Sequence, residues 1–148
     1  MKVTFLPLIM ATLVFLCAGK DTVQASAGAP LLTQEEACDL VYAALHGQKA
    51  LKLPGFGLDE YSDVHFPRFY GFEGTWDNPS GSVVTDHYAV DSQTGDVWSA
   101  TVCSEYKSRH LRKLQRLLRK RHGISERDYQ RIRALGPMCD PGEQPTSS

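Results

Sequence analysis

Hydrophobic and polar positions alternate most regularly between residues 83 and 102. Tyr88 and Val90 lie two positions apart with more polar neighbours, which is typical of a strand with one buried face. The segment from Asp91 to Gly95 has a turn composition, because Asp and Ser bond nearby backbone groups and Gly accepts a positive φ. Apolar residues then return at every second position. The pattern predicts a β-hairpin with strands at 83–91 and 96–102.

A third strand precedes the hairpin. Tyr70, Phe72 and Trp76 share one face at the two-residue period, so we expect a strand over 69–76. Residues 48–67 contain prolines, glycines and acidic side chains, and they predict a loop with at most a short strand near 64–66.

Three segments have helical spacing. Thr33 and Glu36 have the spacing of a capping box, which predicts a helix that runs to about His46. We expect Ser104 to cap a second helix that ends near His122, where Gly123 follows. Ser125 begins a third helix that reaches about residue 135. The apolar stripe of the first helix consists of Ala37, Leu40, Val41, Ala44 and Leu45.

Together these elements predict an α+β fold, with an N-terminal helix packed on a three-stranded antiparallel meander and two C-terminal helices after it. We expect one domain over 28–140 and a disordered tail over 141–148, because the tail is short, polar and terminal.

The hairpin resembles the end of a PepSY-type domain, a small α+β module of secreted and envelope proteins. The residues that carry the resemblance are Tyr88, Val90, Asp91, Thr94, Gly95 and Val97. The resemblance extends over about residues 31–102 and implies a binding or peptidase-inhibiting role without catalysis. The long basic helix that follows departs from the PepSY pattern, so a distinct family stays open.

The N-terminus has the pattern of an export signal. Lys2 precedes an apolar run over 5–18, and Ala25-Ser-Ala27 is a small-x-small cleavage site. The run is shorter than the roughly 20 residues of a membrane span. Cys17 lacks the preceding small residue of a lipoprotein signal and is expected to leave with the signal. We therefore expect a periplasmic or secreted protein, cleaved near Ala27.

Three cysteines remain after that cleavage, and an oxidising compartment favours one disulfide. The preferred pair is Cys103 with Cys139, which ties the chain end to the end of the last predicted strand. Cys38 with Cys103 is the alternative. If it is unpaired, Cys38 serves as a small apolar residue.

The formal net charge of −1 conceals an asymmetry. Residues 28–102 contain three Lys or Arg and eleven Asp or Glu, whereas residues 103–148 contain eleven and five. No acidic residue lies between Lys107 and His122. The basic side chains that we propose for partner binding are Arg109, Arg112, Lys113, Arg116, Arg119 and Lys120.

Three interpretations of this basic helix stay open. It can be a solvated face that neutralises the acidic half of the same domain. It can also dock on an acidic exported protein, or rest on an anionic membrane surface. Nucleic acid is disfavoured, because the export signal removes the protein from it and aromatic residues do not interleave with the charge.

The sequence gives little evidence of a metal site, a cofactor site or a catalytic site. The five histidines are scattered, no C-x-x-C motif is present, and no spacing indicates a metal or another cofactor. The sequence has no G-x-S-x-G motif, and the Asp86 and Asp91 carboxylates are expected at exposed strand edges. A small envelope hydrolase or metal-dependent enzyme that uses His87 and nearby carboxylates is the alternative. Cys38 or Cys103 could also pair with His87 as a thiol, but an exported chain favours a disulfide. The primary prediction is a small binding or inhibitor-like module that acts through protein contacts without catalysis.

Overall fold

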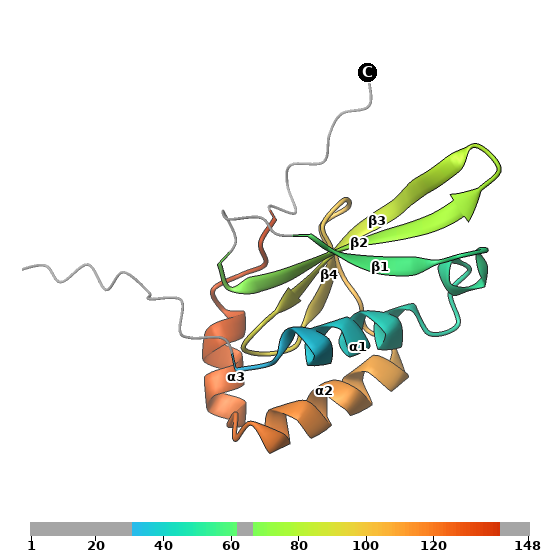
Figure 1. Cartoon of the computed structure of the whole chain (residues 1–148). Coiled ribbons are helices and arrows are strands. Elements are labelled where there is room, and N and C mark those ends of the chain that lie inside the picture. The colour runs from blue at the N-terminus through green and yellow to red at the C-terminus, as the bar shows by residue number, and fades with distance from the viewer. Residues whose placement is uncertain (1–30, 62–66, 140–148) are drawn as a thin grey trace, which may run out of the picture.

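One antiparallel sheet, covered on one face by the helix α1 (Gln34–Leu45), forms the centre of the molecule (Figure 1). The structure is a computed structural model that describes residues 31–61 and 67–139. The predicted α+β class is confirmed. The predicted signal, the 141–148 tail and the possible strand at 64–66 lie outside the described residues.

The sheet is a meander in the order β1-β2-β3-β4-β5, and the prediction of three strands was wrong. The two long strands, β2 and β3, correspond to predicted strands, but β4 is shorter than expected. β1 forms where we expected a loop, and β5 forms where we expected a helix to begin. The strands are β1 (Gly57–Tyr61), β2 (Phe69–Asn78), β3 (Gly81–Asp91), β4 (Val97–Ser99) and β5 (Ser104–Glu105).

The two unexpected strands depend on pairing with neighbours rather than on their own pattern. β1 pairs along its whole length with β2, from Gly57 opposite Thr75 to Tyr61 opposite Gly71. Its side chains are mostly exposed and show no apolar alternation. Because β1 is an edge strand, it needs little hydrophobic burial to be held by the ladder.

The core lies between α1 and the sheet. The Thr33 hydroxyl accepts from the Glu36 amide, and the Glu36 carboxylate accepts from the Thr33 amide, so the predicted capping box is confirmed. Leu40 of α1 packs in one cluster with Phe72 of β2 and Val90 of β3, and all three are fully buried. Each such side chain contributes about 1.5 to 3 kcal/mol through burial.

The turn between β3 and β4 is buried, although turns of this composition usually lie at the surface. The Leu31 and Leu32 amides donate to the Ser92 carbonyl at 3.0 and 2.9 Å. Arg68 Nε lies 3.0 Å from Asp91 Oδ2. Asp91 is therefore buried and paired, and the expectation that its carboxylate is exposed was wrong.

The C-terminal helices are α2 (Arg109–Arg121) and α3 (Glu126–Arg133). The cap of α2 lies four residues after the predicted cap at Ser104, because Ser104 pairs with Ser99 in the sheet. Ser108 caps α2 instead, through its side chain and the Leu111 amide. α2 lies alongside α1, and α3 crosses at the end of both helices (Figure 1).

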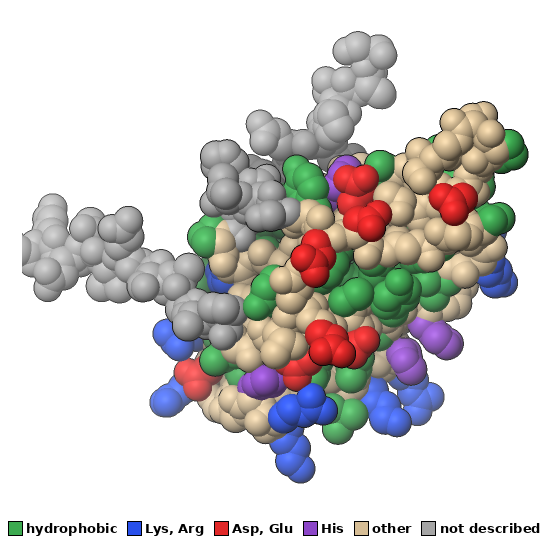
Figure 2. Space-filling model, viewed as in Figure 1, with side chains coloured by type: hydrophobic (Ala, Val, Ile, Leu, Met, Phe, Trp, Pro, Cys, Tyr) green, Lys and Arg blue, Asp and Glu red, His purple; other side chains and the backbone are tan. Residues whose placement is uncertain are grey.

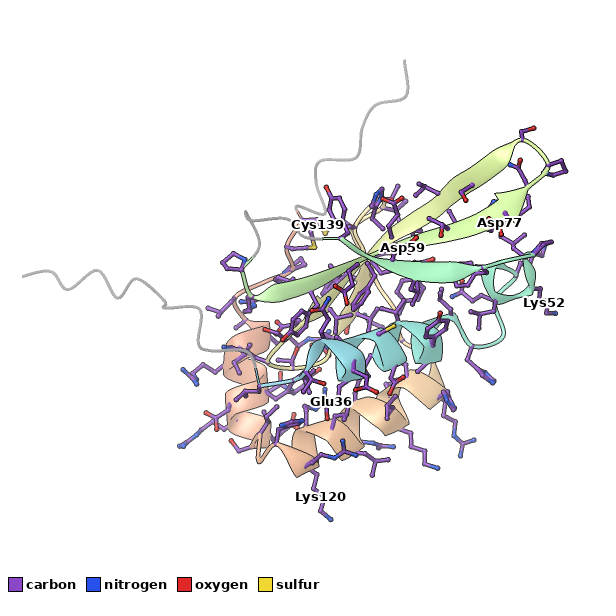
Figure 3. The ribbon with its side chains drawn as sticks, viewed as in Figure 1. Glu36, Lys52, Asp59, Asp77, Lys120 and Cys139 are labelled. Carbon is purple, nitrogen blue, oxygen red and sulfur yellow. A yellow bond between two sulfur atoms is a disulfide. The ribbon has the colours of Figure 1, made fainter. Side chains whose placement is uncertain are left out.

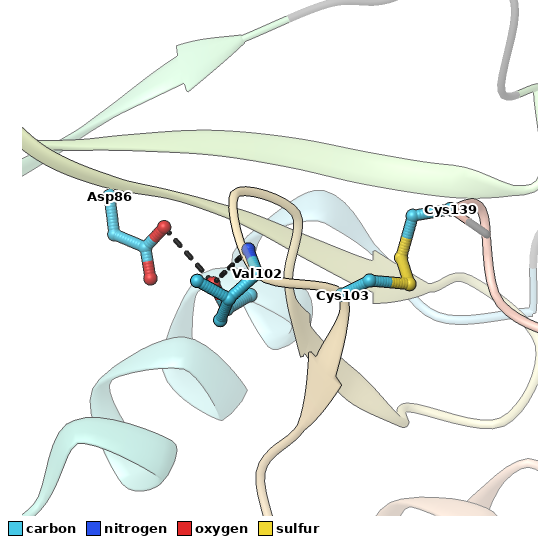
Figure 4. Close-up of a disulfide and its surroundings, with 5 residues drawn as sticks. Asp86, Val102, Cys103 and Cys139 are labelled. Atoms are coloured by element: carbon cyan, nitrogen blue, oxygen red, sulfur yellow. Dashed lines mark hydrogen bonds between the residues drawn. A yellow bond between two sulfur atoms is a disulfide. The ribbon is translucent and has the colours of Figure 1, made fainter. Parts of the chain in front are cut away.

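A disulfide joins Cys103 to Cys139, as predicted from the sequence (Figure 4). Cys103 lies in the β4–β5 turn with φ of 47°. The Val102 amide donates to the Ser99 hydroxyl at 3.4 Å, and that hydroxyl donates to Asp86 Oδ1 at 3.1 Å. The turn and the end of the described chain are thus anchored to β3. Cys38 is unpaired and half-buried in α1.

Candidate binding surface on α2 and α3

The six basic residues predicted for partner binding occupy four kinds of position in the structure. Arg109 and Lys113 face outward on α2, Arg119 turns inward, and Arg112 and Arg116 lie at the mouth of a pocket. Lys120 points away from the molecule at the other end of the helix (Figure 3). The helix is therefore more than one uniform charged face.

Arg119 is a structural residue. Its Nη1 lies 3.7 Å from Asp96 Oδ1 and donates to the Thr94 carbonyl at 3.1 Å. Its guanidinium carbon lies 4.1 Å from the centre of the Tyr129 ring, which is cation–π geometry. With a side chain only 14% exposed, Arg119 holds α2 against the buried turn. The Arg119 side chain is therefore not available to a partner protein.

A shallow hollow lies on the outer side of α2. Arg109, His110, Lys113 and Arg116 line it, and its volume is about 530 Å³. The His110 ring stacks on the His46 ring of the α1 end, with 4.7 Å between ring centres. The hollow is cationic and open, and it provides a surface rather than an enclosed site.

A smaller pocket lies between α2, α3 and β5, and we call it the α2–α3 pocket. Its volume is about 250 Å³. Its walls include the aromatic rings of Tyr106 and Tyr129. Five basic side chains line it, namely Lys107, Arg112, Arg116, Arg119 and Arg133.

Two carboxylates at the base of the α2–α3 pocket hold several of these side chains in place. Asp96 is 4% exposed, and Arg133 Nη1 lies 3.6 Å from its Oδ2. Glu105 Oε2 accepts from Arg133 Nη2 at 2.6 Å and lies 3.1 Å from Lys107 Nζ. The Tyr129 hydroxyl accepts from Arg133 and donates to Asp96. Burial raises the pKa of Asp96, and the neighbouring guanidinium groups oppose that rise.

Arg112 and Arg116 have no ion-pair partner within the described residues. Arg112 Nη2 donates to the Lys107 carbonyl at 2.9 Å, which orients its guanidinium. Five basic and two acidic side chains line the pocket, so an excess of positive charge remains at its mouth. Sequence reasoning missed Tyr129 and Arg133, although their four-residue spacing on a predicted helix was a usable signal.

Acidic side chains gather on another part of the surface, over α1 and β1 (Figure 2). Asp39 and Glu60 lie close enough to Cys38 to influence its thiol. Burial raises the pKa of Cys38, and these two carboxylates raise it further. A raised pKa keeps the thiol protonated at neutral pH, which disfavours it as a nucleophile. The molecule thus presents an acidic surface and a separate basic one.

The enzyme alternative depended on His87 with nearby thiols or carboxylates. Cys103 is in the disulfide, and Cys38 lies on α1, which covers the opposite face of the sheet from His87. His87 Nε2 lies 3.3 Å from Glu73 Oε2, and its ring contacts Tyr61. In residues 31–61 and 67–139, no cluster of three or more His, Cys, Asp or Glu side chains has a metal-binding arrangement.

The helices within the described part of the chain are all too short or too polar to span a membrane.

No family model matches the sequence, and no curated protein matches it. Among solved structures, the chain is similar to a chain of a type VI secretion system effector–immunity complex from Pseudomonas protegens. The two chains are 29% identical with a TM-score of 0.58, and the match covers 70% of this chain and 87% of that one. The PepSY resemblance is not tested by these comparisons and stays a prediction.

Proposed function

We propose that the protein is an exported, immunity-like module that neutralises a partner protein by binding it. The observation that carries the proposal is the similarity to a chain of an effector–immunity complex, which extends over most of both chains. The disulfide and the predicted export signal are compatible with a role in the periplasm or outside the cell.

The basic side chains of α2 favour a partner whose contacting surface is acidic. Like charges along one helix repel each other, and scattered acids would remove that cost. An acidic partner surface would relieve the repulsion and accelerate association through electrostatic steering. The sequence from Arg109 to Arg121 contains no acid, and the exposed side chains of Arg109, Arg112, Lys113 and Arg116 have no ion-pair partner among the described residues.

Affinity capture tests the proposal. The mature, disulfide-bonded protein is immobilised and exposed to envelope and culture extracts of its own organism, and captured proteins are identified by mass spectrometry. The captured partner is then exported into a bacterial host with and without this protein. We expect growth arrest by the partner alone and recovery when both are exported.

Two results of this assay would overturn the proposal. The first is that the mature protein itself arrests growth, which would assign it the effector role. The second is that it changes the intact mass of the captured partner, which would favour the enzyme alternative with His87. An unchanged partner mass, together with recovered growth, supports inhibition by binding alone.

Contact with an anionic membrane surface is a second candidate, and one observation favours it. Leu117 is 53% exposed on α2 among basic side chains, so it is available to a membrane interface, whereas Leu111, Leu114 and Leu118 pack toward the core. Sedimentation with anionic vesicles at low salt, and release as salt rises, would support this candidate. Equal sedimentation with neutral and with anionic vesicles would exclude a specific contact with an anionic membrane surface.

A further inference from the structure

We infer that the α2–α3 pocket is an anchor for one carboxylate side chain of the partner protein, bound between Arg112 and Arg116. This inference depends on the proposed function for the identity of the partner, but the chemistry of the pocket can be tested without it.

The base of the pocket is fixed before a ligand arrives. Asp96 and Glu105 engage Arg133 from two sides, and the Tyr129 hydroxyl connects Arg133 to Asp96. Because these groups already have their partners, a ligand does not need to displace them. Such preorganisation lowers the entropic cost of binding.

The mouth of the pocket has the donors for an anion. Arg112 and Arg116 are four residues apart on α2, so their side chains project from the same side of the helix. Both are exposed, and neither has an acidic partner in the described part of the chain. Guanidinium groups present paired donors whose geometry matches the two oxygens of a carboxylate.

The volume of the pocket limits the size of the ligand. Pockets for drug-sized molecules occupy about 300 to 1,000 Å³, whereas this one has about 250 Å³. A single side chain fits this volume better than a nucleotide or an extended peptide. The Tyr106 and Tyr129 rings provide apolar walls for the methylene groups of a Glu or Asp side chain.

The pocket has an excess of positive charge, which attracts a carboxylate or a phosphoryl group. Five basic and two acidic side chains line it. A carboxylate is the anion that an unmodified acidic partner presents, and its methylene groups can contact the Tyr106 and Tyr129 rings. Inorganic phosphate has no such methylene groups, so we expect it to bind more weakly.

Two measurements test the inference. The first is an NMR titration of the mature protein with a short blocked peptide that contains one Glu, its Gln counterpart, and inorganic phosphate. We expect saturable shifts of the Arg112 and Arg116 Nε–Hε signals with the Glu peptide, none with the Gln peptide, and weaker binding of phosphate. Tighter binding of phosphate than of the Glu peptide would overturn the carboxylate assignment.

The second measurement compares variants in binding to the captured partner. We expect R112Q/R116Q to weaken the complex at least tenfold, because charge-assisted hydrogen bonds are lost. R112K/R116K keeps the charge without the guanidinium geometry and should weaken it less. The matched control is R127Q/R131Q, which removes two charges at the same spacing from the exposed side of α3 and should change affinity less than twofold.

The outcomes separate the two proposals. If the Glu peptide binds the pocket and no partner is captured, the proposed function fails and the pocket assignment stands. If a partner is captured and neutralised, but R112Q/R116Q and R127Q/R131Q behave alike, the pocket assignment fails and the proposed function stands. Equal thermal stability of the variants and the wild type shows that lost binding is not lost folding.

Discussion

Asp96 shows how a buried charge is maintained in this molecule. Its carboxylate is 4% exposed, and it contacts Arg119, Arg133 and the Tyr129 hydroxyl. These contacts offset the cost of removing the charge from water, and they connect the β3–β4 turn to α2 and α3. Asp96, which lies between β3 and β4, therefore joins this connection to both C-terminal helices.

Replacement of Asp96 with Ala should destabilise the protein by about 2 to 4 kcal/mol, because Arg119 and Arg133 lose a buried partner. Urea denaturation of the mature protein measures the change. Asp59→Ala is the control, since Asp59 lies exposed on β1 (Figure 3), and we expect it to stay within about 0.5 kcal/mol of wild type. An equal effect of the two substitutions would contradict this role of Asp96.

Glu36 makes a pH-dependent link between α1 and α2. Burial raises the pKa of Glu36, but the Thr33 amide, His122 and Arg121 together lower it below its usual value of about 4.5. Its stabilising contribution is therefore complete above that value and is lost as the pH falls through the lower pKa of the folded state.

We expect the stability of the wild type to fall more steeply between pH 5 and pH 3 than that of Glu36→Gln, by about 1 kcal/mol in this interval. Urea midpoints measured across the interval test this expectation. Parallel curves for the two proteins would show that Glu36 keeps an ordinary pKa in the folded state.

At the scale of elements, the sequence predicted those elements whose signals are local. The capping box located the start of α1, and two-residue alternation located β2 and β3. β1 was missed because its acidic, exposed residues show no alternation, and only its pairing with β2 makes it a strand. α2 begins later than predicted for a similar reason, because Ser104 pairs with β4 and does not cap the helix.

The β3–β4 turn packs closely under α1, and this packing is testable at Gly95. Gly95 has φ of +76°, and a Cβ there would lie 3.0 Å from Leu40 Cδ1. Gly95→Ala should therefore cost about 2 to 3 kcal/mol, from the positive φ and from overpacking. Gly47 has φ of +82° with open space around it, so Gly47→Ala should cost only about 1 kcal/mol. Equal costs would mean that the turn is loosely packed.

At the scale of the whole molecule, the α2–α3 pocket could not be predicted from sequence patterns. It joins Asp96 from the β3–β4 turn, Glu105 from β5, and side chains of two helices. The sequence indicated a basic helix, but it could not show that Arg119 turns inward while Arg112 and Arg116 remain available. That distinction depends on long-range packing, which periodicity does not encode.

The disulfide joins Cys103 to Cys139, which are 36 positions apart in the sequence. It closes a loop that contains α2 and α3. In the chain-entropy model a loop of this length contributes about 3 to 4 kcal/mol. Cys103→Ser with Cys139→Ser should lose that stability in urea denaturation, whereas Cys38→Ser without reductant should retain most of it. A larger loss for Cys38→Ser than for the double variant would contradict the assigned pairing.

Calorimetric titration of the captured partner into the mature protein tests the central claim most directly. We predict a saturable complex of one partner per protein with submicromolar affinity, weakened at least tenfold by R112Q/R116Q and little changed by R127Q/R131Q. No saturable binding of any captured protein would contradict the claim that this molecule acts by holding a partner.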